Sequence, residues 1–278
     1  MKELFDSVSY KCSRLVTLSY STSFSLGIKL LDRSIRNAIF SIYGFVRFAD
    51  EIVDAFHDFD KEELLAEFEK DYYTAYEKNI CLNPIINAFQ LTVKKYGIDD
   101  DLIQSFLRSM KSDLLKSSFD TQEIKEYIYG SADVVGLMCL KVFLNGDDKK
   151  YNELKPYAMR LGSAFQKVNF LRDISSDTNQ LHRIYFPILK ENSLTNEIKK
   201  QIIDDINEDF RIALEGIKQL PKTSKKGVYA AYVYYKKLSR KIEKTNAQKM
   251  LTKRIRISNP IKIWLLGYCF LTGKLKMV

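Results

Sequence analysis

The stretch FVRFADEIVD, residues 45–54, places three carboxylates inside a segment that is otherwise apolar enough to be buried. Asp54 follows Asp50 and Glu51 by four and three positions, and residues at that spacing share one face of a helix. Charge is costly in a protein interior unless it is paired, bound to metal or functional. The stretch therefore predicts a buried helix whose carboxylates have a task.

A second stretch, AFQKVNFLRDISSDTNQ (164–180), repeats this pattern of a polar face on an apolar helix. The two polar faces comprise Tyr43, Arg47, Asp50, Glu51 and Asp54, and Gln166, Asn169, Arg172, Asp173 and Asp177. We call the five acids the first acidic row (Asp50, Glu51, Asp54) and the second acidic row (Asp173, Asp177). Two such helices face to face would wall a cavity with carboxylates, although buried ion pairs to Arg47 and Arg172 are the structural alternative.

The rest of the chain predicts an all-α fold. Apolar residues recur at helical spacing nearly everywhere, and alternating strand patterns are scarce. Acidic or small polar residues mark plausible helix starts at Asp32, Asp60, Asp99 and Thr121. Without repeats, low-complexity segments or a dividing linker, we expect one domain, 1–278, of nine to eleven helices.

Composition limits where the protein works and what it meets. Four single cysteines, with no C-x-x-C pair, favour free thiols in a reducing cytoplasm. The N-terminus resembles no targeting signal, and no uninterrupted apolar run approaches the roughly 20 residues that span a bilayer. The net charge of +9 resides at the C-terminal end, where residues 221–278 hold fifteen Lys and Arg against one acid, Glu243. Such a basic segment suits anionic lipid, nucleic acid or a phosphorylated small molecule.

Carboxylates on two opposed helices suit the binding of Mg²⁺ and a diphosphate. Mg²⁺ takes one or two protein carboxylates per ion, keeps water and completes its octahedron with phosphate oxygens. Metal ions that neutralise the charge developing on a diphosphate make it a good leaving group. If the substrate is allylic, a carbocation remains, which needs a dry, aromatic-lined pocket. The 17 Tyr and 17 Phe supply candidates for such a lining.

These residues resemble the head-to-head prenyl synthases, the phytoene and squalene synthase family, over most of the chain. The segments that carry the resemblance are YSTSF (20–24), YGFVRFADEIVD (43–54), YGSADVVG (129–136), FQKVNFLRDISSD (165–177) and RIYFP (183–187). The residues of these segments look most like those of bacterial phytoene synthases. The resemblance implies an isoprenoid-synthase-type helical bundle with a central cavity.

The resemblance also implies roles for individual residues. Mg²⁺, or Mn²⁺ in its place, would be held by Asp50, Glu51, Asp54, Asn169, Asp173 and Asp177, with Gln166 assisting. Diphosphate oxygens would be met by Ser21, Tyr43, Arg47, Arg172, Arg183, Tyr234 and Arg254, and the hydrocarbon tunnel would be lined by Phe24, Val134 and Leu137. Among these, Asp50, Asp54, Asp173, Asp177, Tyr43 and Arg47 would be catalytic. Two positions depart from the family pattern: Glu51 replaces an Asp, and Asp133 replaces a small residue.

The implied reaction joins two geranylgeranyl diphosphates through prephytoene diphosphate to give phytoene, without NADPH. Farnesyl diphosphate as substrate, giving squalene or dehydrosqualene, is the alternative within the family. A non-catalytic assembly factor with the same fold is a third reading, but both acidic rows are present, whereas such relatives tend to lose acids.

The expected partners are an allylic isoprenoid diphosphate and a membrane surface. The segment NPIKIWLLGYCFLTGKLKMV (259–278) combines basic and aromatic residues, which suits peripheral attachment to an anionic membrane or, alternatively, a final helix capping the bundle. Nucleic acid is not expected, because residues 1–220 are net acidic and no recognition motif is visible. The expected location is the cytoplasm, and the sequence leaves the oligomeric state open.

Overall fold

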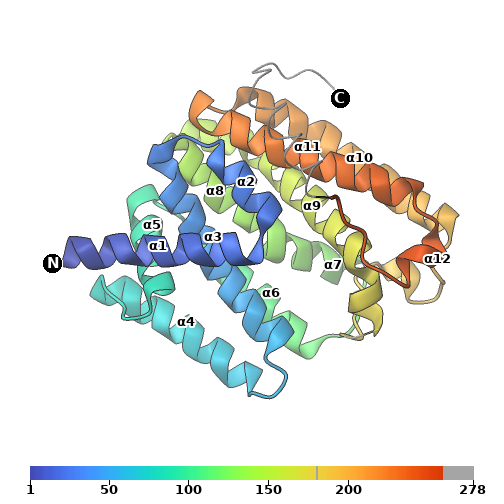
Figure 1. Cartoon of the computed structure of the whole chain (residues 1–278), viewed down its shortest axis with the longest axis horizontal. Coiled ribbons are helices and arrows are strands. Elements are labelled where there is room, and N and C mark those ends of the chain that lie inside the picture. Colours follow the sequence, from blue (N-terminus) through green and yellow to red (C-terminus); the bar gives the residue numbers. More distant parts are fainter. Residues whose placement is uncertain (180, 259–278) are drawn as a thin grey trace.

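The computed structural model describes residues 1–179 and 181–258, and these residues form helices with no β-strand (Figure 1). The all-α prediction is confirmed, although the described residues hold twelve α-helices rather than nine to eleven. The helices are α1 (Lys2–Tyr20), α2 (Thr22–Lys29), α3 (Arg33–Ala55), α4 (Lys61–Lys78), α5 (Pro84–Tyr96), α6 (Asp100–Leu115), α7 (Thr121–Ile128), α8 (Val134–Leu144), α9 (Asp148–Asn179), α10 (Asn196–Gln219), α11 (Lys222–Lys244) and α12 (Ala247–Met250). A π-helix, η1 (Tyr129–Asp133), joins α7 to α8, and a short 3₁₀ helix, η2 (Pro187–Leu189), follows α9.

Helix starts follow local capping chemistry. Asp32, Asp60 and Asp99 are the N-cap residues of α3, α4 and α6, as predicted. The fourth predicted start, Thr121, is the first residue of α7, and the cap is Asp120, whose carboxylate accepts two backbone N–H bonds. A carboxylate at this position satisfies N–H groups that have no partner within the helix. The boundaries were therefore readable from single residues.

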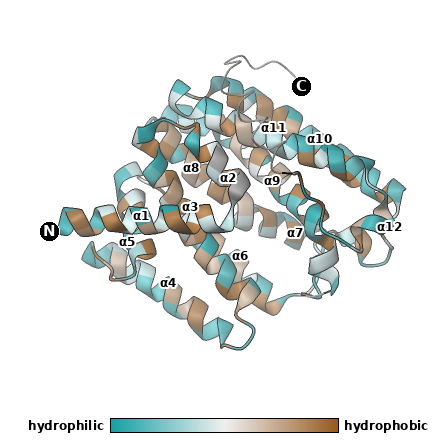
Figure 2. Ribbon diagram, in the orientation of Figure 1, coloured by the Kyte–Doolittle hydropathy of each residue, from teal (hydrophilic) through white to brown (hydrophobic). Residues whose placement is uncertain are grey.

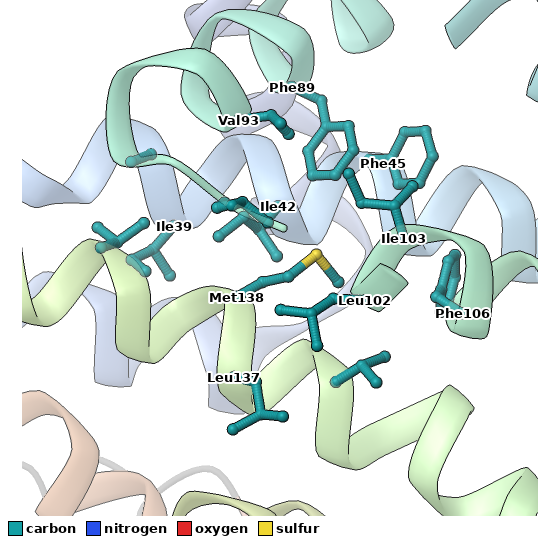
Figure 3. Packing of buried hydrophobic residues seen from close by; sticks show 14 of the residues in the cluster. Ile39, Ile42, Phe45, Phe89, Val93, Leu102, Ile103, Phe106, Leu137 and Met138 are labelled. Carbon is teal, nitrogen blue, oxygen red and sulfur yellow. The ribbon is translucent and has the colours of Figure 1, made fainter. Parts of the chain in front are cut away.

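The first stretch quoted above lies at the centre of the main core. Phe45 of α3 is fully buried and stacks on Phe89 of α5, with ring centroids 4.0 Å apart. Figure 3 shows these rings among aliphatic side chains of α3, α6 and α8, including Ile42, Ile103 and Met138. A second apolar cluster holds α9, α10, α11 and α12 together on the other side of α9. Helix α9 therefore separates two cores and belongs to both.

Helix α8 belongs to a continuous helical run, Thr121–Leu144, that passes through the interior. By length and mean hydropathy this run could cross a membrane, but it is mostly buried inside the protein, as a core helix is. Its π-helix lies against α6 at Gly130, where a Cβ atom would overlap Ser109 Oγ and the Ser105 carbonyl oxygen. Glycine is required there because the two backbones approach too closely for a side chain.

We expect Gly130→Ala to lower the free energy of unfolding by about 1–3 kcal/mol, because overpacking forces backbone shifts. Urea unfolding followed by circular dichroism measures the loss. Adding Ser109→Gly should recover only part of it, since the clash with the Ser105 carbonyl oxygen remains. Full stability of Gly130→Ala alone would contradict the close packing of η1 on α6.

Candidate active site

An apolar cavity of about 280 Å³ lies between α2, α3, α8, α9, α10 and α11. One end is lined by polar and aromatic groups, including Tyr43, Gln166, Asn169 and Tyr235. From there α9 lines the cavity through Gly162 and Ala158 to Leu154. Because the rest of the lining is mainly apolar, the cavity suits a molecule with a charged head and a long hydrocarbon tail.

The first acidic row lies on α3, and Arg47 of the same helix pairs with two of its members. The guanidinium donates to Asp50 and Glu51 and also lies 4.5 Å from the ring centroid of Tyr20. Its Nε is buried without a partner among the described residues. Burial and the neighbouring charge of Asp54 raise the pKa of Asp50 above its ordinary value. Arg47 therefore lowers the repulsion among these carboxylates, but the pKa of Asp50 stays above its ordinary value.

The second acidic row lies at the C-terminal end of α9, and arginines from two places meet Asp173. Arg172 donates to it at 2.5 Å, and Arg254, distant in sequence, approaches to 2.6 Å. By contrast, the Asp177 side chain has no hydrogen bond or ion pair among the described residues. Burial and the charges of Asp173 and Asp54 raise the pKa of Asp177 to about 7.

The two rows approach each other across the site. Asp54 lies on α3 and Asp177 on α9, yet the charge of the first raises the pKa of the second. Arg183, in the segment after α9, donates to Asp54 at 2.8 Å and so links that segment to α3. The predicted opposition of the two rows is thus present, and so are the ion pairs of the structural alternative.

A buried acid that the sequence analysis missed fixes Arg183. Asp113 of α6 accepts hydrogen bonds from Tyr127 Oη at 2.5 Å and Tyr185 Oη at 3.2 Å, while its backbone carbonyl accepts from Arg183 at 3.0 Å. Burial raises the pKa of Asp113 to about 6, although Arg183 and Tyr127 lower it. The network joins α6, α7 and the segment after α9, and it aims the guanidinium of Arg183 at Asp54.

The remaining predicted residues lie as follows. Ser21 caps α2 by accepting from the backbone of Phe24, and the Phe24 ring stacks on Tyr43 with centroids 5.0 Å apart. Both rings line the cavity, together with Gln166 and Asn169. Asn169 accepts from Tyr235 Oη at 3.3 Å. These groups form the polar end of the cavity, next to the acidic rows.

Three predicted lining or binding residues lie elsewhere. Val134 and Leu137 are fully buried in the main core, on the face of α8 that packs toward α3 and α6. The opposite face lines the cavity, with Val135, Gly136 and Cys139 among its residues. On α11 the predicted residue and the lining residue also differ by one position. Tyr234 was predicted to meet the diphosphate, but its neighbour Tyr235 lines the cavity. A shift of one residue turns a helix by about 100° and exchanges core for cavity.

The donor set fits Mg²⁺ in type. Burial and the charges of Asp173 and of Asp54, which lies on the other helix, raise the pKa of Asp177, an effect that a bound cation would relieve. Asp177 also has no hydrogen-bond or ion-pair partner for its side chain among the described residues. In the described part of the chain, no three His, Cys, Asp or Glu side chains lie close enough to hold a metal by themselves. Mg²⁺ commonly takes only one or two protein carboxylates and fills its shell with water and phosphate oxygens.

Asp133, whose orientation the sequence left open, points inward. It ends η1, is 6% exposed and accepts a hydrogen bond from Ser163 Oγ of α9 at 2.8 Å. Gly162 makes room for it, since a Cβ there would meet Asp133 Oδ1 at 2.9 Å. Burial raises the pKa of Asp133 to about 7, and the charge of Asp209 adds to this effect against Lys167 and Arg160.

These features define a class of helical protein in which carboxylates and arginines surround the polar end of a deep apolar cavity. The sequence matches the squalene/phytoene synthase family model over residues 18–260. The chain belongs to the squalene/phytoene synthase family, as its motifs predict.

Curated relatives and solved structures agree with this assignment. The phytoene synthase of Arthrospira platensis is 27% identical over 262 residues, which cover 85% of this chain and 84% of the relative. The chloroplastic phytoene synthase 2 of Oryza sativa subsp. japonica is 30% identical, with 91% and 68% covered. A dehydrosqualene synthase solved with a ligand superposes with a TM-score of 0.79 at 18% identity, covering 97% of this chain and 98% of that one. The squalene synthase of Alicyclobacillus acidocaldarius gives 0.74 at 20% identity, covering 88% and 95%. At such identities the solved structures show the shared fold.

We expect the buried Asp133 to make stability depend on pH. Its pKa is raised from 3.8 to about 7, so the native protein holds a proton that the unfolded chain has released between these values. The stabilisation is therefore complete below pH 4 and is lost as the pH rises through 7. Asp133→Asn keeps the shape of the side chain and the hydrogen bond from Ser163. At pH 8 its free energy of unfolding, measured in urea, should exceed that of wild type by about 1 kcal/mol or more. If the difference in unfolding free energy between Asp133→Asn and wild type were the same at pH 8 and at pH 5, a buried, proton-binding Asp133 would be contradicted.

Proposed function

We propose that this protein is a Mg²⁺-dependent prenyltransferase of the phytoene synthase type. It would join two geranylgeranyl diphosphates head to head, through prephytoene diphosphate, to give phytoene and free diphosphate in carotenoid biosynthesis. The observation that supports this most is the approach of two acidic rows, from α3 and α9, beside the polar end of an apolar cavity. The names of the curated relatives favour the same reaction.

In this proposal the charged groups hold and release the diphosphate. Bound Mg²⁺ supplies positive charge that stabilises the departing diphosphate. The carboxylates of Asp50, Glu51, Asp54, Asp173 and Asp177 and the amide oxygen of Asn169 would hold Mg²⁺, and water and phosphate oxygens would supply the remaining ligands. The arginines that now pair with the acidic rows, Arg47, Arg172, Arg183 and Arg254, bind diphosphate oxygens. A diphosphate offers these guanidinium groups a second anion, so carboxylates become available for metal.

The cavity protects the carbocation that ionisation leaves behind. Phe24 and Tyr43 form one stacked pair at its polar end, and Phe165 and Tyr235 form another, with centroids 4.0 Å apart. Ring faces stabilise a nearby cation electrostatically, and the apolar lining excludes water that would quench it. No step in this sequence requires NADPH.

The depth of the cavity favours a C20 substrate over the C15 alternative. Along α9 the lining runs from Gln166 to the buried Leu154, twelve residues or about 18 Å of helix. Carbon–carbon bonds of about 1.5 Å advance an extended zigzag chain by about 1.25 Å each. The sixteen-carbon main chain of a C20 tail therefore extends about 19 Å, and the twelve-carbon chain of a C15 tail about 14 Å. The longer tail fills the apolar length. A C15 substrate, giving squalene or dehydrosqualene, remains the second candidate because solved structures with this fold carry those names.

The expected partners follow from this chemistry. The enzyme would take an allylic isoprenoid diphosphate in the cytoplasm, at or near a membrane surface, and would not bind nucleic acid. The basic and aromatic segment 259–278, expected to meet that surface, lies outside the described residues and stays a prediction. The non-catalytic alternative is less favoured, because the acids and arginines of a diphosphate site are all present.

We expect Asp50→Ala and Asp173→Ala each to lower turnover by roughly 10²–10³-fold or more, because each removes charge that holds the metal and diphosphate. Purified protein is incubated with Mg²⁺ and geranylgeranyl diphosphate, and the hydrocarbon is identified by mass. Asp205→Ala is the matched control, since Asp205 lies on α10 at the same Asp-x-x-x-Asp spacing but pairs with Lys167 outside the cavity. Near-normal turnover of either test variant with an intact circular dichroism spectrum would refute the assignment.

We also expect Cys139→Phe to shorten the accepted chain. Cys139 lines the cavity one helical turn beyond Gly136, and its thiol stays protonated because burial raises its pKa to about 12. A phenyl ring there would fill the deep part of the cavity. Turnover of geranylgeranyl diphosphate should fall at least tenfold, and turnover of farnesyl diphosphate should change less than threefold. Cys139→Ala, the control, should keep the C20 activity; equal losses on both substrates would contradict the proposed depth.

A further inference from the structure

Helix α1 packs on the bundle through its polar residues. Ser9, Ser13 and Thr17, spaced four apart, are completely buried against the rest of the protein. Their hydroxyls bond carbonyls of α1 itself, as Ser9 Oγ does to Phe5 at 2.9 Å. Small side chains let α1 lie close to α3: a Cβ at Gly44 would be only 3.2 Å from Ser13 Cβ.

The outward face of α1 is apolar as a result. Leu4, Val8, Leu15 and Leu18 are 67%, 41%, 66% and 36% exposed, and Lys11 is the exposed residue between them. Their spacing of four, seven, eleven and fourteen from Leu4 places all five on one line along the helix. We call these five residues the α1 stripe. Figure 2 shows α1 on the near face of the molecule with apolar residues recurring along it. The usual orientation of an amphipathic helix is reversed here.

A loop held beside α1 carries a further exposed apolar residue. Asn87 of α5 donates to Asp6 and Ser9 of α1 and accepts from the backbone of Cys81, which holds the α4–α5 loop next to α1. Leu82 in this loop is 89% exposed. A row of exposed apolar residues such as the α1 stripe commonly marks a contact with another molecule or a membrane.

We propose that the α1 stripe docks this protein onto an anionic lipid bilayer. Lys11 within the stripe and Arg14 at its edge are exposed, and neither has a carboxylate partner among the described residues. A helix with an apolar face and unpaired cations lies in the interface of a membrane that carries negative headgroups. A second copy of the chain is less suited, because symmetric pairing centred on the stripe would bring Lys11 against Lys11.

The stripe ends next to the candidate active site. Tyr20 is the last residue of α1, and its ring lies under the guanidinium of Arg47, which pairs with the first acidic row. A bilayer along the stripe would therefore lie close to the groups at the polar end of the cavity. Docking itself depends only on the surface of α1 and not on the reaction proposed above.

The test is sedimentation of the full chain with vesicles of phosphatidylcholine alone or with 30% phosphatidylglycerol. Wild type should bind the anionic vesicles at least tenfold more tightly than the neutral ones. Leu4→Ser combined with Leu15→Ser should weaken binding to anionic vesicles at least tenfold. Lys11→Glu combined with Arg14→Glu should remove the preference for anionic lipid. Leu115→Ser is the matched control, because Leu115 is 73% exposed at the end of α6, away from the stripe, and should change binding less than twofold.

Two results would overturn the proposal. If the Leu4 and Leu15 double variant binds vesicles as wild type does, another part of the chain carries the contact. If that variant instead converts a dimer to a monomer in analytical ultracentrifugation, the stripe is an interface between copies. Circular dichroism and a thermal melt on each variant establish that it is folded, so that a loss of binding reports on the surface alone.

Discussion

Repulsion between carboxylates of α3 and α9 is the constraint on which the site depends. Burial and the charge of Asp54 raise the pKa of both Asp50 and Asp177, so the carboxylates at this site need opposite charge nearby to remain ionised. Arginines supply that charge, and Arg183 does so from a position fixed by the buried Asp113 network. Because guanidinium groups bind carboxylate and phosphate in the same geometry, the pairs that stabilise the free protein are also those that a diphosphate would replace. In the proposed function, a bound diphosphate would therefore take over guanidinium groups that pair with carboxylates in the free protein.

The cavity exists because helices approach closely at small residues around it and leave space between these contacts. Gly136 meets the backbone of Ala158, and Gly162 meets the end of η1. These two contacts hold α8 and η1 against α9, while larger side chains on their flanks line the cavity. A protein interior is otherwise packed as densely as an organic crystal, so an apolar space of this size persists only where rigid backbone contacts keep the walls apart.

Features that depend on neighbouring residues could be predicted from the sequence. Features that depend on the rotation of a helix about its axis, or on partners distant in sequence, could not. The caps Asp32 and Asp60 follow from single acidic residues at helix starts, and the two acidic rows follow from spacing of three and four residues. The π-helix η1 could not be foreseen, and Val134, which was expected to line the tunnel, lies fully buried in the main core. Asp113 was missed because its partners come from α7 and from the segment after α9. Its one signal was an acid among apolar residues in the stretch MKSDLL.

Helix α1 shows why hydrophobic periodicity alone does not orient a helix. Periodicity locates an apolar face, and the usual assumption turns that face inward. Burial of Ser13 gains little from the hydrophobic effect, but it lets α1 approach α3 at Gly44 more closely than a leucine would. The hydroxyls satisfy themselves on their own helix, so their burial leaves no polar group unpaired. Close backbone packing with satisfied hydroxyls therefore competes with apolar burial, and where it prevails the leucines face outward, beside the site where a lipid-like molecule would enter.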